Sequence, residues 1–408
     1  MLSVGIDTHQ KMHQVEVQNN DRKVMWRGQI TNDREGFNTI LEKLKVIEKS
    51  NSDSIKGIFI NPTGNYHIPV HYFLENNGYN VVYVDPRVTD YARKMLNLGK
   101  EKSDKVDAHM LASTPWMDNN AFDKPIHRRE PVSGLTRLHQ SVTRNITRIT
   151  NIINSDLACI FPEFNNIFSD VGSKTSIAVL EKFTTPSNIV KAGLNTILKV
   201  MQGASRNHYK KEDAERLINL ANNSVGIPDI DSIRTFTIRH NIARLVSENK
   251  QLKEIEEEIL KLTENNENVK RIDDMNGIGP VNAAAIVSEI GNIEQFDSAE
   301  KLQSYGGKAP KMVGSGGKDY ATGISKIRNS HLSNTVYESA RSMVNHKNEE
   351  FLMIYEREVN KGKNKKQAYI IVSRRLLYHI FSIMKNKKPY RVRLPNTGGG
   401  KGSTVTLS

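Results

Sequence analysis

The 408-residue sequence has a single cysteine, Cys159, and few aromatic residues, which make up 7% of the chain. One thiol cannot form an internal disulfide, and it excludes a cysteine-based structural zinc site. No apolar run approaches the roughly 20 residues that span a bilayer, and an acidic residue, Asp7, interrupts the first apolar stretch. We therefore expect a cytoplasmic protein with no signal peptide and no membrane partner.

Positive charge is the abundant feature. The chain has 58 lysines and arginines against 45 acidic residues, which gives a formal net charge of +13. Such an excess favours a polyanionic partner, and nucleic acid is the first candidate. A generally basic solvated surface is the alternative, because net charge reports non-specific attraction.

Residues 1–125 predict an α/β domain. Three β-like runs resemble a meander, a helical pattern follows, and two short apolar runs have the composition of strands buried on both faces of a parallel sheet. In chain order these segments are LSVGID, QVEVQ, KVMWRGQI, REGFNTILEKLKVIEK, GIFI and VVYV.

Residues 133–265 predict a mainly helical region. Apolar residues recur at intervals of three and four in two long segments, which favours a helical hairpin or coiled coil over an ordinary bundle. Asn249 fills the one gap in the second pattern, where a buried asparagine would set the register. Residues 266–390 form a third, basic unit, and the Gly- and Ser-rich segment 394–408 predicts a flexible tail.

Three aspartates form a candidate metal site. Asp7 closes the first strand, and Asp104 and Asp107 are three residues apart at a predicted helix start, which puts both on one helical face. Converging carboxylates suit Mg²⁺, and such ions can stabilise a phosphodiester exchange. Taken singly, each aspartate is explained as well by capping a turn or a helix N-terminus.

Two glycine-containing segments of the third unit are candidate DNA contacts. Gly277 and Gly279 suit the hairpin of a helix-hairpin-helix, although a simple interhelical turn explains them equally well. Ser315 lies among glycines, and the same segment contains lysines and an arginine. From the residues alone we interpret this segment as a phosphate-binding loop, since no group that would activate the serine is evident. The basic residues are Lys308, Lys311, Lys318, Lys326 and Arg328.

The segments VGIDTHQKMHQVEV, NPTGNYHIPVHYFLENNGYNVVYVDP and KSDKVDAHMLA resemble the amino-terminal RuvC-like domain of DEDD-type insertion-sequence transposases, the group that includes the Piv DNA invertase. The resemblance implies a RuvC/RNase-H-like fold in which Asp7, Asp104 and Asp107 are three of the four acids that hold Mg²⁺. The chain departs from the pattern at Asn61, where the family has glutamate. Asn61 keeps an oxygen ligand but loses a charge, which predicts a weaker metal site and reduced activity. Asp85 or Glu101 are candidates to compensate.

The carboxy-terminal unit resembles the transposase domain of the same family over about residues 269–332. The matching pieces are Asn276 to Gly279, Gly307 to Pro310, Ser315-Gly316 and Ser325-Lys326. By this resemblance Ser315 is the nucleophile, with Ser325 as the second candidate. Departures occur at Lys308, Arg328 and Ser333. The amphipathic segment that follows carries further candidate phosphate ligands, and a solvated face is the alternative; they are Lys361, Lys363, Lys365, Lys366, Arg374 and Arg375.

The resemblance implies a DNA recombinase of an insertion sequence that works through a phosphoserine intermediate. It also implies donor and target DNA as partners, a non-coding bridge RNA as guide, and a homo-oligomer between dimer and tetramer. Two alternatives stay open. One is a RuvC-like junction nuclease that uses only the acidic site, and the other is a catalytically impaired nucleic-acid-binding relative.

Overall fold

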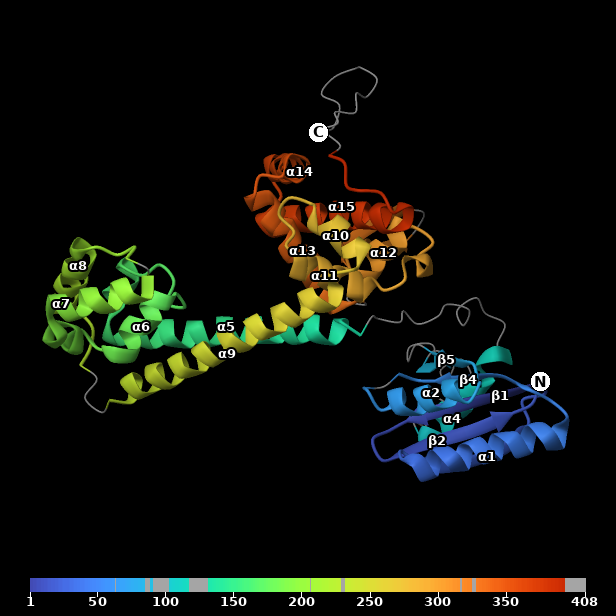
Figure 1. Ribbon diagram of the computed structural model, residues 1–408. Helices are drawn as coiled ribbons and strands as arrows, with labels where there is room; N and C mark the ends of the chain where they lie inside the picture. The colour runs from blue at the N-terminus through green and yellow to red at the C-terminus, as the bar shows by residue number, and fades with distance from the viewer. Residues whose placement is uncertain are drawn as a thin grey trace, which may run out of the picture. The chain divides into compact units, whose positions relative to one another are not determined.

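The computed structural model describes residues 1–62, 64–84, 89–90, 103–116, 131–205, 207–228, 232–315, 318–324 and 328–392, with the backbone alone in 310–315 and 318–324. The chain divides into two compact units, Met1–Arg128 and Arg129–Ser408, and each has its own architecture (Figure 1). In the described residues no helix combines the length and the hydropathy needed to cross a bilayer.

The first unit is built on a mixed five-stranded sheet with the strand order β3-β2-β1-β4-β5. β1 pairs antiparallel with β2, and β2 with β3, so the predicted meander is confirmed; β4 pairs parallel with β1 and β5. The strands are β1 Leu2–Thr8, β2 Met12–Gln18, β3 Val24–Thr31, β4 Ile55–Ile60 and β5 Val81–Tyr83.

Helices cover both faces of this sheet. Leu2, Val4 and Ile6 of β1 are fully buried in one hydrophobic core with residues of α1 and α2. The alternation of side chains along a strand then puts Ser3, Gly5 and Asp7 on the opposite face, where α4 contacts β1 and β2. The helices are α1 Arg34–Asn51, α2 His67–Asn76 and α4 Asp104–Ser113, followed by the 3₁₀ helix η1 Thr114–Trp116.

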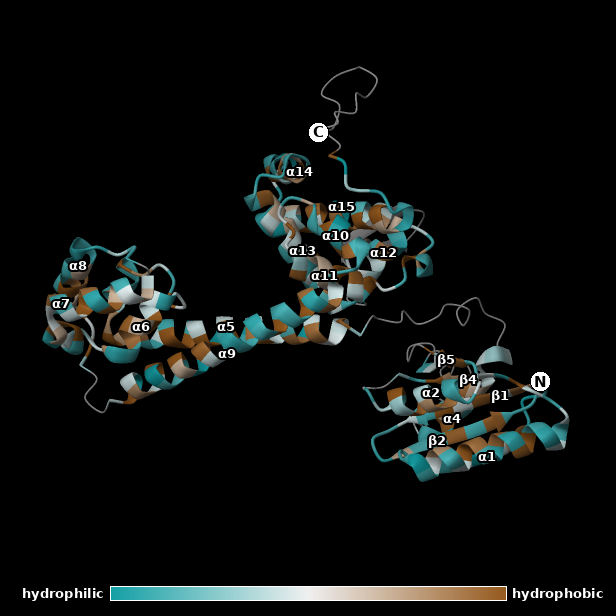
Figure 2. Cartoon of the chain, viewed as in Figure 1, coloured by the Kyte–Doolittle hydropathy of each residue, from teal (hydrophilic) through white to brown (hydrophobic). Residues whose placement is uncertain are grey.

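Two long helices, α5 Ser133–Ile160 and α9 Ile233–Thr263, lie side by side in the second unit (Figure 1). Hydrophobic and hydrophilic residues alternate along both in Figure 2, as expected for amphipathic helices. Asn249 is exposed, so its predicted burial in the seam is wrong; Asn241 is the buried asparagine of α9, and its amide donates to the carbonyl of Thr237. The shorter helices between them are η2 Pro162–Asn166, α6 Lys174–Lys182, α7 Pro186–Ser205 and α8 Lys211–Asn222.

The remainder of the second unit is a helical core from which one β-hairpin departs. Its apolar residues form a single cluster that also includes Ile259 of α9. The helices are α10 Glu267–Asp273, α11 Pro280–Ile290, η3 Ile293–Gln295, α12 Ala299–Tyr305, α13 Ser330–Asn345, α14 Glu349–Asn360 and α15 Lys365–Asn386. The hairpin joins β6 Pro310–Ser315 to β7 Lys318–Ile324.

Candidate functional site

The carboxyl ends of β1 and β4 bring Asp7 and Asn61 to neighbouring positions. The parallel register pairs Ile6 with Ile60, so the residue after each occupies the next position along its strand. The Thr8 hydroxyl donates to the carbonyl oxygen of Asn61 over 3.1 Å, which ties the two chain segments together at this edge. Asp7 and Asn61 therefore lie at the carboxyl ends of the parallel strands, where α/β sheets commonly hold ligands.

α4 brings the other two aspartates to the same edge. Ser103 caps the helix, because its hydroxyl accepts a hydrogen bond from the Val106 N–H, and Asp104 and Asp107 occupy the first turn. The helix packs directly on β1, where the Ser3 hydroxyl donates to the carbonyl of Ala112 over 2.7 Å. The helix start is thus held against the end of β1.

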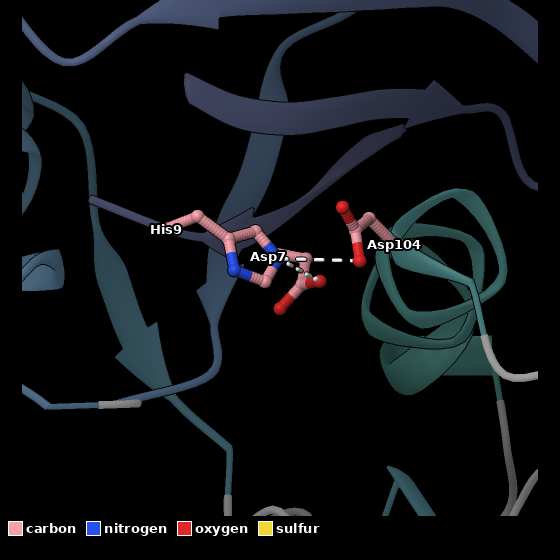
Figure 3. Close-up of side chains that lie close together, drawn as sticks. All are labelled: Asp7, His9 and Asp104. Carbon is pink, nitrogen blue, oxygen red and sulfur yellow. Dashed lines mark hydrogen bonds and ion pairs between the residues drawn. The ribbon is translucent and has the colours of Figure 1, made fainter. Parts of the chain in front are cut away.

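Asp7, His9 and Asp104 form a cluster whose candidate ligand atoms all lie within 4.8 Å of one another (Figure 3). The His9 Nε2 atom lies between the two carboxylates, 3.1 Å from Asp7 Oδ2 and 3.3 Å from Asp104 Oδ1. The His9 backbone N–H donates to Nδ1 of His13. His9 was missed in the sequence, where its only signal is its place two residues after the strand-ending Asp7.

The electrostatics of Asp7 reflect its crowded, buried position. The pKa of Asp7 is raised to about 6: burial raises it most, the charge and hydrogen bond of His9 lower it, and the nearby charges of Asp107 and Asp104 raise it. The Asp7 side chain is 7% exposed and that of Asp104 is 59% exposed, so the cluster is open on the side of α4. A bound cation would favour the charged form of all three aspartates.

Asn61 supplies the observation that tests whether a metal suits this site. Its Oδ1 atom is buried and accepts no hydrogen bond within the described part of the chain. An orphaned amide oxygen beside clustered carboxylates is a donor set that fits a hard divalent cation. Asp7, Asn61, Asp104 and Asp107 are the residues that would hold it. Asp85 and Glu101, the candidates for compensation, lie outside the described residues.

A second buried network fixes α4 on the sheet. Glu16 of β2 lies on the α4 face with its side chain fully buried, and it contacts His109 of α4 over 2.6 Å and Arg27 of β3 over 2.7 Å. Burial raises the pKa of Glu16, but the hydrogen bonds from His109, Gln18 and Arg27 outweigh it and lower that pKa below its usual value. The Glu16 carboxylate therefore joins α4 to two strands.

The candidate nucleophile lies on the hairpin of the second unit. Ser315 is the last residue of β6, and the antiparallel register pairs it with Lys318, the first residue of β7. Lys311 is on β6 as well. The second candidate, Ser325, and the neighbouring Lys326 lie outside the described residues.

The two glycines between α10 and α11 have different surroundings. Gly277 has a φ of +96°, and a Cβ there would lie 2.5 Å from the Cα of Met343, so its missing side chain makes room for α13. Gly279 caps α11 with Pro280 at the first helical position, and a Cβ on it would contact nothing within 4 Å. Gly279 is therefore the glycine of the pair that leaves open space at a helix start.

The basic residues of α15 and of the segment before it differ in their partners. Lys365 and Lys366 open the helix and are exposed. The Arg374 Nε–H donates to Oε1 of Gln303, and Arg375 is bound to the buried carboxylate of Glu350. Lys361 and Lys363 pair with Glu358. Lys365, Lys366 and Arg374 are therefore the residues of this set that have no carboxylate partner in the described structure, and Arg374 is held by an amide.

Two family models match the chain, one over its amino-terminal part and one over its carboxy-terminal part. A DEDD transposase model of the IS110 type matches residues 4–162, which include Asp7, Asn61, Asp104 and Asp107. A transposase model of the IS116/IS110/IS902 family matches residues 269–356, which include the β6–β7 hairpin. The chain belongs to the IS110/IS116 family of transposases. As a member of this family it is an insertion-sequence transposase, an enzyme that cuts and rejoins DNA.

Proteins of two insertion elements align with most of this chain, and a third relative aligns with a quarter of it. The protein of insertion element IS116 from Streptomyces clavuligerus is 22% identical over 315 residues, 77% of each chain. The protein of insertion element IS110 from Streptomyces coelicolor is 22% identical over 73% of this chain and 74% of its own. The transposase for insertion sequence element IS1111A from Coxiella burnetii is 28% identical over 102 residues, 25% of this chain and 28% of its own.

Proposed function

We propose that this transposase cuts and rejoins DNA through a phosphoserine intermediate, with Ser315 as the nucleophile and Mg²⁺ held by Asp7, Asn61, Asp104 and Asp107. The observation that carries the proposal is the cluster of Asp7, His9 and Asp104, whose ligand atoms lie within 4.8 Å of one another at the carboxyl end of the sheet. The raised pKa of Asp7 supports it, because a carboxylate that is buried and lies near two others is suited to a cation.

The acidic residues and the serine have separate roles. A divalent cation bound at the site would stabilise the negative charge that develops on the reacting phosphate. Asp7 and Asp104 supply charged oxygens and Asn61 a neutral one, so we propose a site that binds metal less tightly than one with four carboxylates, and a correspondingly reduced activity.

Ser315 carries the covalent step. Its hydroxyl gives up a proton, its oxygen forms a bond to phosphorus, and the bond from that phosphorus to one sugar oxygen breaks as the sugar oxygen takes up a proton. Attack of a sugar hydroxyl on the phosphoserine reverses these changes and rejoins the strand. The basic residues Lys311, Lys318, Lys326 and Arg328 would hold neighbouring phosphates, and Lys365, Lys366 and Arg374 would extend the same positive surface, with Gly277 and Gly279 as backbone contacts.

The covalent intermediate gives the decisive experiment. We expect the wild-type protein, incubated with Mg²⁺ and end-labelled element DNA, to yield a protein–DNA adduct that survives denaturing electrophoresis, and Ser315→Ala to lose it. Ser325→Ala is the matched control and should keep the adduct. Strand cleavage that persists in Ser315→Ala would instead favour a RuvC-like junction nuclease that uses only the acidic site.

We propose in addition that a bridge RNA selects the DNA and that the chain assembles as a tetramer. The net charge of +13 and the 7% aromatic content support recognition of nucleic-acid backbone rather than stacked single bases. Nucleic acid that co-purifies with the protein should then contain one discrete, structured RNA. Recovery of DNA fragments without such an RNA would contradict the guided mechanism.

A further inference from the structure

Lys308 is a buried cation at the start of the hairpin that carries Ser315. It is only 5% exposed and stands between α12 and β6. Its backbone N–H donates to the carbonyl of Gln303 over 2.8 Å, so the main chain at Lys308 is held against the end of α12. Lysine is among the residues that are least often fully buried without a partner, and this position therefore requires an explanation.

Among the described residues the Lys308 ammonium has neither a hydrogen bond nor a carboxylate partner. Its Nζ atom lies 5.4 Å from the centroid of the Tyr337 ring, which attracts the charge but cannot replace the hydration that burial removes. A buried cation in this state is costly for the free protein. An anion bound against the ammonium would offset this cost.

A second cation is held close to the first. Gly307 has a φ of +64°, and a Cβ there would lie 2.1 Å from Cδ of Arg328, so the Arg328 side chain lies directly on the Gly307 backbone. The pKa of Lys308 is lowered to about 8, mainly by burial and in addition by the charge of Arg328. Two like charges kept together at the base of one hairpin are the arrangement that a phosphate would neutralise.

We propose that Lys308 and Arg328 together bind a backbone phosphate of the DNA at the base of the β6–β7 hairpin. This inference rests on the proposed function in that DNA is the substrate. Between Lys308 and Ser315 the chain runs along the extended strand β6, Pro310–Ser315, whose two ends are about 17 Å apart. The bound phosphate is thus a site separate from the bond that Ser315 attacks, and Lys308 contributes to binding rather than to the covalent step.

The test measures affinity for an element-end DNA duplex against salt concentration, with the full-length protein and no added metal. Lys308→Met should weaken binding about tenfold or more and reduce the slope of log affinity against log salt by about one. Lys301→Met removes the same charge from an exposed position of α12 and is the matched control. Lys308→Arg keeps the charge and should retain most of the affinity.

Thermal melting supplies a second readout, in which Lys308→Met should exceed the wild-type protein although it binds DNA more weakly. Lys308→Met should melt at a higher temperature than the wild-type protein, because a buried charge with no carboxylate partner among the described residues has been replaced by an apolar chain of similar length. Higher stability with weaker DNA binding is the pattern that phosphate binding predicts. Binding equal to that of Lys301→Met, or a loss of both stability and affinity in Lys308→Arg as well as Lys308→Met, would overturn the proposal.

Two further experiments distinguish a DNA phosphate from free phosphate, and the Lys308 proposal from the proposed function. In the first, inorganic phosphate at constant ionic strength should change the melting temperature of wild-type protein and Lys308→Met equally. If phosphate raises the melting temperature of the wild type alone, and Lys308→Met binds DNA with unchanged affinity, the site binds free phosphate and the DNA assignment is overturned. Ser315→Ala should bind DNA with wild-type affinity and salt slope. A covalent adduct that survives in Ser315→Ala would contradict the proposed function and leave the Lys308 result standing.

Discussion

Gly5 of β1 and Ala108 of α4 are in direct backbone contact. A Cβ added to Gly5 would lie 2.2 Å from the carbonyl oxygen of Ala108 and 2.3 Å from the amide nitrogen of Ala112. No side chain fits between this strand and this helix, and so the first turn of α4, with Asp104 and Asp107, is kept at the end of β1 beside Asp7. The missing side chain of Gly5 therefore sets the separation of the acidic residues.

Gly5→Ala should disturb the acidic site from a distance. The added methyl group pushes α4 away from β1, which we expect to lower the free energy of unfolding by about 1–3 kcal/mol and to weaken Mg²⁺ or Mn²⁺ binding by about tenfold or more. Calorimetric metal titration and thermal melting check both effects. Gly134→Ala is the control, since a Cβ there contacts nothing within 4 Å. Wild-type metal affinity in Gly5→Ala would show that the site does not depend on this contact.

The raised pKa of Asp7 predicts a pH dependence of stability in metal-free protein. A carboxyl that holds its proton more tightly when folded destabilises the fold as pH rises, here from about 4 to about 6, and the whole penalty, on the order of 3 kcal/mol, is present above pH 6. Asp7→Asn should remove it, so the variant is more stable than wild type at pH 7.5 in EDTA and equal to it near pH 4.

Denaturant unfolding at the two pH values measures this difference. Asp21→Asn, in the exposed turn after β2, is the control and should follow the wild-type profile. Mg²⁺ should stabilise wild-type protein above pH 6, where Asp7 is charged, and have little effect near pH 4. A stabilising effect of Mg²⁺ that is equal at both pH values would place the cation elsewhere.

Local patterns in the sequence were sufficient to name the carboxylates as candidates, and the resemblance to the transposase family favoured a metal site over capping. Asp7 follows an apolar strand, and the three-residue spacing of Asp104 and Asp107 at a helix start needs no knowledge of the rest of the chain. The strands of the first unit and the long helices α5 and α9 follow from periodicity in the same way. Each of these features depends on residues that are close together in the chain.

Features that depend on strand register were not predictable. Glu16 meets His109 only because β2 pairs with β1 and α4 lies across both, which no local pattern reports. His9 contributes to the acidic cluster through the position of Asp104, a residue 95 positions away in the chain. Asn249 matches the apolar repeat but is exposed, because the repeat does not say which stretch of α9 contacts α5. All three features depend on contacts between residues that are far apart in the chain.

Asn61→Glu should strengthen metal binding. The substitution adds a fourth carboxylate beside Asp7, so the metal-free protein should lose stability while its affinity for Mg²⁺ rises about tenfold or more. Asn61→Gln keeps a neutral amide and is the control. Unchanged metal affinity in Asn61→Glu would mean that position 61 does not face the cation. Recombination that appears only in Asn61→Glu would support a catalytically impaired protein, and robust recombination by the wild type would contradict it.

Glu289 joins three segments of the second unit, and its loss should be costly. Its carboxylate is 1% exposed and receives Arg137 Nε and Nη2 of α5 at 2.5 and 2.8 Å, and it also receives the side-chain amide of Asn329 at 2.6 Å. Asn329 in turn caps α13 and directly follows Arg328. Because breaking a buried pair leaves its partners unsatisfied, Glu289→Gln should lower the free energy of unfolding by on the order of 3 kcal/mol.

Denaturant unfolding of Glu289→Gln beside Glu257→Gln tests this role. Glu257 pairs with Lys253 on the surface of α9, where the side chains are 65% and 78% exposed, so its substitution should cost well under about 1 kcal/mol. Since Asn329 is bound to the same carboxylate, Glu289→Gln should also weaken DNA binding through the displaced Arg328. A stability loss no larger than that of Glu257→Gln would show that the Glu289 carboxylate does not hold α5 to the helices of this core.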